Sequence, residues 1–347
     1  MARSPRRDLI DATEVGVYHC VQRAVRRAWL CGQDPVTGKN FDHRKVWIQD
    51  RLAFLAGQFS IDICAMAIMS NHIHLVVRNR PDIAGQWSDA EVARRWWNLF
   101  PGRKTDDDKP ADPEPHELEM LMADSEQLQE RRQRLSSISW LMRCLAEPIA
   151  RRANREDRCS GRFWEGRFKC QRLLDESAVL ACSVYVDLNP IRAGIAETPE
   201  SSSFTSAFER IQARAETGDA AAEGMPAGKT GVGCDGSLHG QQVGRATVGR
   251  ATRNTGGHGQ TPRDGWLSPV ELQGEAVAES RPAEGRASDK GFLPLNLDQY
   301  LELLDWTGRQ ARPDKRGQIP AELLPILQRL RLSSETWVET VLNFGRW

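Results

Sequence analysis

The hydrophobic pattern over the first 80 residues predicts a strand, a helix and then two more strands. Val15–Gln22 alternates in part and is rich in residues that favour strands. Apolar side chains recur at helical spacing within Arg44–Phe59, and Asp42 is a suitable N-terminal cap for this helix. Two short apolar runs, 61–69 and 72–78, predict strands that pair as a hairpin. This order of elements is half of a ferredoxin-like layout.

Further periodic segments follow as far as residue 200. Asp89–Phe100 is predicted to form a short helix. Ser136 or Ser137 caps a further amphipathic helix, whose apolar stripe runs from Ile138 to Ile149, and Pro148 should kink or split it. Arg167–Leu174 is predicted to be a strand, and Glu176–Asn189 a helix. Together these elements favour an α+β fold built on this ferredoxin-like layout.

Composition divides the chain into four parts. Residues 1–14 form a basic N-terminal arm, and 15–200 hold the α+β domain with an acidic insertion at about 102–134. Gly, Ala, Ser, Thr and Pro dominate 201–290, which is predicted to be a disordered, low-complexity linker. Residues 291–347 are predicted to be a small helical C-terminal region. These last helices form either a separate module or a layer packed on the main domain.

The formal net charge is zero, but the charges are segregated along the chain. Residues 131–172 hold 12 Lys or Arg against 4 Asp or Glu, a local charge of +8. Residues 106–130 hold 10 Asp or Glu against one Lys, a local charge of −9. A concentrated basic segment indicates nucleic-acid binding, although a solvated helix face would have the same composition.

The eight cysteines include no Cys-x-x-Cys pair, which argues against a structural zinc site. No apolar run approaches the length of a membrane-spanning helix, and no signal-type apolar region follows the basic N-terminus. We therefore expect a cytoplasmic protein with reduced thiols and no membrane partner.

The chemically most informative stretch begins at the third predicted strand. Because side chains alternate along a strand, His72 and His74 point to one face, while Ile73, Leu75 and Val77 point to the other. Two imidazoles one strand step apart can present nitrogen ligands to a divalent cation. Two half-buried histidines on a sheet would show the same pattern, so the pair alone does not decide between these roles.

A tyrosine and an amide lie one helical turn apart near the end of the helix 176–189. Tyr185 and Asn189 share a helical face there, although a buried tyrosine and a helix stop would look alike. A cation held by His72, His74 and the Asn189 amide oxygen would polarise a phosphate, and Tyr185 could attack its phosphorus. The resulting covalent bond stores the phosphodiester energy. No nucleotide cofactor is therefore required.

Three stretches, Ser70–Val76, Gly161–Phe168 and Tyr185–Gly194, resemble the REP-associated tyrosine transposases, relatives of the single-tyrosine HUH transposases of insertion sequences. Their order and spacing also fit, and the resemblance covers roughly residues 10–200. It implies that 15–200 form a catalytic domain, a ferredoxin-like antiparallel sheet flanked by helices, with the histidine pair on a central strand. Related enzymes often have a glutamine at the place of Asn189.

The resemblance further implies that His72 and His74 bind Mg²⁺ or Mn²⁺ and that Tyr185 forms a 5′-phosphotyrosine. The implied partner is single-stranded DNA with REP-type hairpins, bound by a monomer or a homodimer. We expect the DNA backbone to contact basic residues of this region: Arg23, Arg143, Arg151, Arg152, Arg162, Arg167 and Lys169. Rival functions are a replication-initiator or relaxase nickase, a non-catalytic hairpin-binding regulator and a metal-binding protein without a DNA partner.

Overall fold

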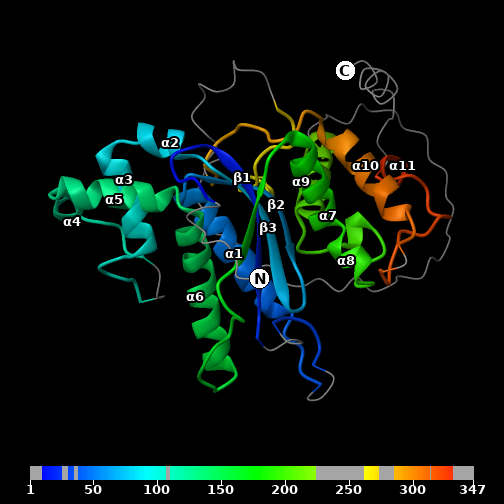
Figure 1. Cartoon of the computed structure of the whole chain (residues 1–347), viewed down its shortest axis with the longest axis horizontal. Helices are drawn as coiled ribbons and strands as arrows, with labels where there is room; N and C mark the ends of the chain where they lie inside the picture. The colour runs from blue at the N-terminus through cyan, green and yellow to red at the C-terminus, as the bar shows by residue number, and fades with distance from the viewer. Residues whose placement is uncertain are drawn as a thin grey trace, which may run out of the picture.

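A four-stranded antiparallel sheet forms the centre of the computed structural model (Figure 1). The structure describes residues 10–25, 30–34, 38–106, 110–223, 262–272, 285–312 and 314–330. The strands are β1 (Gly16–Arg23), β2 (Ile61–Ile68), β3 (His72–Asn79) and β4 (Lys169–Leu173), in the spatial order β2-β3-β1-β4. All neighbouring strands are antiparallel. The predicted ferredoxin-like sheet is therefore confirmed.

One face of the sheet is covered by α1 (His43–Gln58) and α6 (Ile138–Glu156), which pack against each other. Ile73, Leu75 and Val77 are buried in the core between these helices and the sheet, as the alternation predicts. Asp42 occupies the N-cap position of α1, but its side chain makes no capping hydrogen bond and instead pairs with Lys45 at 2.9 Å.

Helix α6 continues through Pro148, so the predicted split does not occur. A proline removes the N–H that would bond the carbonyl four residues earlier, here that of Cys144. Arg51 of α1 donates from Nε to the Cys144 oxygen at 3.1 Å. The neighbouring helix thus satisfies the acceptor that Pro148 leaves without its usual partner.

The opposite face of the sheet packs against helices from the second half of the chain (Figure 1). Of these, α7 (Glu176–Asp187) and α9 (Ser206–Glu223) contact the strands, and the short α8 (Asn189–Arg192) and α10 (Leu297–Arg309) contact α7. Their apolar side chains form a second core with those of β2 and β3. The short segments η2 (Pro199–Ser201) and α11 (Ile326–Arg329) complete this side. The C-terminal helices thus pack on the main domain rather than forming a separate module.

The acidic insertion belongs to a small helical group at one end of the molecule (Figure 1). This group contains α2 (Pro81–Gln86), α3 (Asp89–Leu99), α4 (Pro115–Met122) and α5 (Ser125–Leu135). Helices α3, α4 and α5 contact one another, and α3 also contacts α1. None of the described helices is long and apolar enough to cross a membrane.

The predicted linker over 201–290 needs correction, because parts of it are folded. Ser206–Glu223 form α9, while 262–272 and 285–290 lie against the sheet. Low apolar content hid these segments, since polar hydrogen bonds hold much of them in place. Two stretches of the predicted linker, 224–261 and 273–284, lie outside the described residues, as do 1–9 and 331–347.

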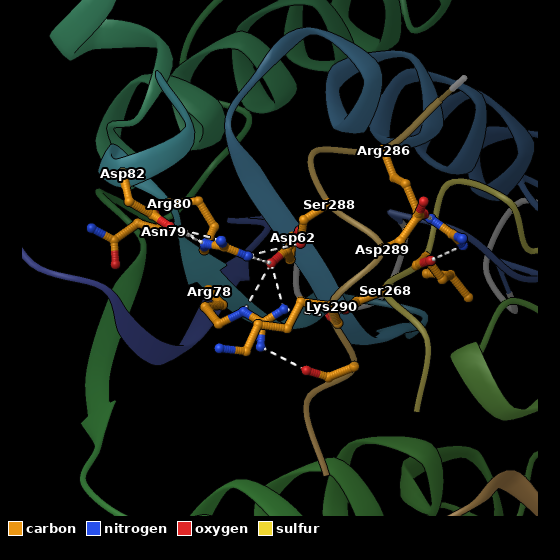
Figure 2. A network of polar contacts seen from close by, with 12 residues as sticks. Asp62, Arg78, Asn79, Arg80, Asp82, Ser268, Arg286, Ser288, Asp289 and Lys290 are labelled. Atoms are coloured by element: carbon orange, nitrogen blue, oxygen red, sulfur yellow. Dashed lines mark hydrogen bonds and ion pairs between the residues drawn. The ribbon is translucent and has the colours of Figure 1, made fainter. Parts of the chain in front are cut away.

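Figure 2 shows the polar network that fixes residues 285–291 to the sheet. Asp62 of β2 is buried and pairs with Arg78 of β3, whose Nη2 lies 2.6 Å from Asp62 Oδ2. Arg78 also donates to the backbone oxygens of Lys290 and Gly291 at 2.6 and 2.8 Å. Ser288 donates to the other Asp62 oxygen at 2.8 Å. A buried ion pair of the sheet thus satisfies the backbone of a distant segment.

Candidate functional site

His72 and His74 lie on β3 and point to the face that α7 covers. His74 is 4% exposed, and its ring centroid lies 4.6 Å from that of His72. Both line a cavity of about 480 Å³, together with Tyr185 of α7. The sheet and the helix that follows β4 therefore bring the two predicted stretches together within one chain.

A third imidazole, that of His19, lies beside the predicted pair and was missed by the sequence analysis. His19 is on β1, opposite Val76 of β3, so its side chain shares a face with His74. The two rings are stacked, with centroids 5.2 Å apart and an interplanar angle of 11°. His19 Nε2 lies 2.9 Å from His74 Nδ1, within hydrogen-bonding distance.

Burial keeps the histidines of the site neutral. Desolvation, with a smaller contribution from Arg23, lowers the pKa of His72 to about 4. Desolvation and the neighbouring His72 and His19 lower the pKa of His74 to about 3. Desolvation also lowers the pKa of His19. Neutral imidazole is the form that binds metal ions, so these side chains are suited to that role near neutral pH.

The hydrogen bonds of His72 and His74 are compatible with metal binding through their Nε2 atoms. His72 Nδ1 lies 2.5 Å from Asn71 Oδ1, an acceptor that fixes the proton on Nδ1. His74 Nε2 is buried and has no hydrogen-bond partner among the residues that the structure describes. No three His, Cys, Asp or Glu side chains in the described ranges are arranged as a metal site. Among the described side chains of these four types, His72 and His74 are thus the two candidate metal ligands.

Asn189, the predicted third ligand, is not among the residues that line the cavity. It begins α8, directly after α7 and Leu188, and its Nδ2 donates to the Tyr185 carbonyl oxygen at 2.9 Å. This bond uses the amide nitrogen and not Oδ1. The role of Asn189 as a ligand therefore stays a prediction.

Tyr185 is the exposed member of the site. Its side chain comes from the last turn of α7, whose start is capped by Asp175 accepting from the Ala178 N–H at 2.7 Å. The Tyr185 residue is 42% exposed, and its ring lies edge-on to His74 with centroids 5.6 Å apart. A tyrosine in this position is accessible to a large substrate while its ring remains in contact with the imidazoles.

The predicted basic residues divide into two groups. Arg23, Arg167 and Lys169 line the cavity, where Glu165 pairs with Arg23 at 3.7 Å. The backbone N–H of Glu165 donates to the Arg23 oxygen at 2.8 Å, which joins the segment before β4 to the end of β1. Strand pairing thus gathers cations from both strands around the imidazoles.

The other predicted basic residues do not line this cavity. Arg143 and Arg151 both pair with Glu147 on α6, and the Arg152 guanidinium lies 3.8 Å from the centre of the Trp47 ring. Arg162 is exposed in the loop before β4. Glu147 of α6 therefore pairs with two of the arginines that were expected to contact DNA, and Trp47 of α1 stacks on a third.

The stretch that follows Tyr185 has a structural role as well. Asp187 is fully buried and accepts from Ser206 Oγ at 2.6 Å and from Tyr300 Oη at 2.6 Å. Arg192 donates to the carbonyl oxygens of Thr307 and Gln310, at the end of α10. The Tyr185–Gly194 stretch thus connects the site to the C-terminal helices.

No family model matches the chain, and no curated protein matches it. One solved structure to which it is similar is a REP-associated tyrosine transposase bound to a REP hairpin. The similarity covers 62% of this chain and 87% of that one, with 13% sequence identity and a TM-score of 0.36.

Proposed function

We propose that the protein is a transposase-like endonuclease and strand transferase acting on single-stranded DNA with REP-type hairpins. The observation that carries this proposal is the meeting of exposed Tyr185 with neutral His72 and His74 in one basic cavity. A nucleophile for phosphoryl transfer must be open to the substrate, and phosphate charge must be balanced near it. The sequence stretches that resemble REP-associated transposases support the choice of hairpin DNA as the proposed substrate.

In the proposed reaction, Tyr185 Oη attacks the scissile phosphorus and releases its proton to solvent. The Oη–P bond forms while the P–O3′ bond breaks, and O3′ leaves with the electron pair and takes up a proton. The 5′ end stays bound to Tyr185 as a phosphotyrosine. Attack by another 3′-hydroxyl reverses these steps and joins two strands without an external energy source.

The surrounding side chains would hold the substrate and a cation. Arg23, Arg167 and Lys169 would contact phosphates on either side of the scissile bond. His72 and His74 would bind Mg²⁺ or Mn²⁺ through Nε2, and Asn189 is proposed as a third ligand through Oδ1. When bound, the cation supplies Lewis-acid polarisation of the phosphate.

Incubation of the protein with labelled single-stranded REP-type hairpins and Mn²⁺ tests the proposal. We expect a covalent protein–DNA band on a denaturing gel, together with a free 3′-hydroxyl fragment. EDTA should remove both products, because the phosphate would then lack its polarising cation. Hairpin binding without a covalent band, across several hairpins and metals, would instead identify a non-catalytic DNA-binding protein.

The basic residues of the cavity should contribute to DNA affinity in a salt-dependent way. Lys169→Ala and Arg167→Ala each remove one cation, so each should reduce the slope of log K against log[salt] by roughly 0.7 for single-stranded DNA. Arg151→Ala is the matched control, since Arg151 is paired with Glu147 and does not line the cavity. Fluorescence anisotropy over a salt series measures the slopes. Slopes of Lys169→Ala and Arg167→Ala that equal the wild-type slope would place the DNA backbone elsewhere.

A further inference from the structure

The His19–His74 contact has a geometry that couples the protonation of two rings. His19 Nε2 and His74 Nδ1 lie 2.9 Å apart, and one of them must carry the proton that they share. The rings are nearly parallel, at an interplanar angle of 11°, so His19 restricts the orientation of the His74 ring. His19 comes from a different strand, and its position is fixed by the β1–β3 register.

The two possible proton positions have different consequences for His74. If His19 donates to His74 Nδ1, then neutral His74 carries its own proton on Nε2. That N–H would be buried without an acceptor, because no described residue offers Nε2 a hydrogen-bond partner. If His74 donates from Nδ1 instead, Nε2 keeps its lone pair. A bound cation would satisfy this lone pair.

We propose that His19 is a positioning residue that holds His74 in the Nδ1–H tautomer and presents Nε2 as a metal ligand. This inference rests on the proposed function for the identity of the ligand, a divalent cation. Asn71 contacts Nδ1 of His72 in the same way, at 2.5 Å. The two ligands would thus be oriented by neighbours from different places, Asn71 from the β2–β3 turn and His19 from β1.

Two substitutions of His19 separate hydrogen bonding from packing. His19→Phe keeps a flat ring for stacking but removes the acceptor. His19→Gln keeps an acceptor oxygen at a reach similar to that of Nε2. The matched control is His43→Phe, since His43 pairs with Glu156 and does not line the cavity.

The first measurement is the tautomer of His74 in the metal-free, full-length protein, from long-range ¹H–¹⁵N NMR of the imidazole rings. We expect the Nδ1–H form in the wild type, His19→Gln and His43→Phe, and a shift toward the Nε2–H form in His19→Phe. An Nε2–H form of His74 in the wild type, or an unchanged Nδ1–H form in His19→Phe, would overturn the proposal.

The second measurement is the affinity for Mn²⁺ alone, by isothermal titration calorimetry. His19→Phe should bind Mn²⁺ about 10- to 100-fold more weakly, as for other residues that orient metal ligands, and His19→Gln should recover most of this affinity. Mn²⁺ binding that is absent in the wild type, or equal in wild type and His19→Phe, contradicts the inference. Neither readout uses DNA. A protein that binds Mn²⁺ as expected but never cleaves hairpins would refute the proposed function and leave this inference in place.

Discussion

Tyr185→Phe is expected to abolish the covalent protein–DNA product while leaving hairpin binding nearly unchanged. The substitution removes the one atom that would attack phosphorus but keeps the ring that packs edge-on to His74. Loss of a nucleophile typically lowers the rate by at least about 10³-fold, because the remaining groups only bind and polarise the substrate. Since Tyr185 is 42% exposed, its hydroxyl contributes little to folding.

Denaturing gels and fluorescence anisotropy measure these two effects separately. Tyr18→Phe is the matched control, because Tyr18 is fully buried on β1 and does not line the cavity. It should form the covalent product at nearly the wild-type rate. If Tyr185→Phe still forms that product, then another residue is the nucleophile and the assignment of Tyr185 is wrong.

The central sheet could be predicted from local patterns alone. Alternation placed His72 and His74 on one face and Leu75 on the other, and the order of the first four elements predicted half of a ferredoxin-like layout. These features depend on side chains two to four residues apart, which a sequence displays directly. The position of Tyr185 at the end of α7 was predictable for the same reason.

The role of His19 could not be predicted in this way. A strand that shifts its register by one residue turns every side chain to the other face. Nothing in Val15–Gln22 states that residue 19 lies opposite Val76 and beside His74. The available signal was that His19 alternates with the apolar positions of the first strand. This signal becomes informative only once the partner strand and its register are known.

The C-terminal half shows the same limit at longer range. The composition of 201–290 predicted a linker, yet α9 packs on the sheet. The predicted C-terminal helical region had two possible placements, and α10 contacts α7 of the main domain. Asp187 contacts Tyr300 across 113 positions of the chain. Periodicity within a short stretch of sequence does not reveal such pairs. In the sequence, Asp187 is only one residue of the stretch that holds Tyr185.

Asp187→Ala is expected to lower the free energy of unfolding by about 3–5 kcal/mol, because each buried donor left unsatisfied costs roughly 1–3 kcal/mol. The carboxylate accepts three hydrogen bonds, from Ser206 Oγ, the Ala207 N–H and Tyr300 Oη. Removing it leaves three donors without their partner, and each such donor is costly when buried. Burial also raises the pKa of the Asp187 carboxyl above its ordinary value. Urea-induced unfolding measures the effect.

Asp175→Ala is the control for this change, since it removes the other hydrogen-bonding aspartate at an end of α7. Asp175 is exposed and accepts from a single backbone N–H, that of Ala178. Losing this cap should cost about 1 kcal/mol. Tyr300→Phe removes one of the three bonds to Asp187 and should cost an intermediate amount, about 1–2 kcal/mol. If Asp187→Ala costs no more than Asp175→Ala, then α9 and α10 are held on α7 by their apolar contacts, and the buried carboxylate adds little to stability.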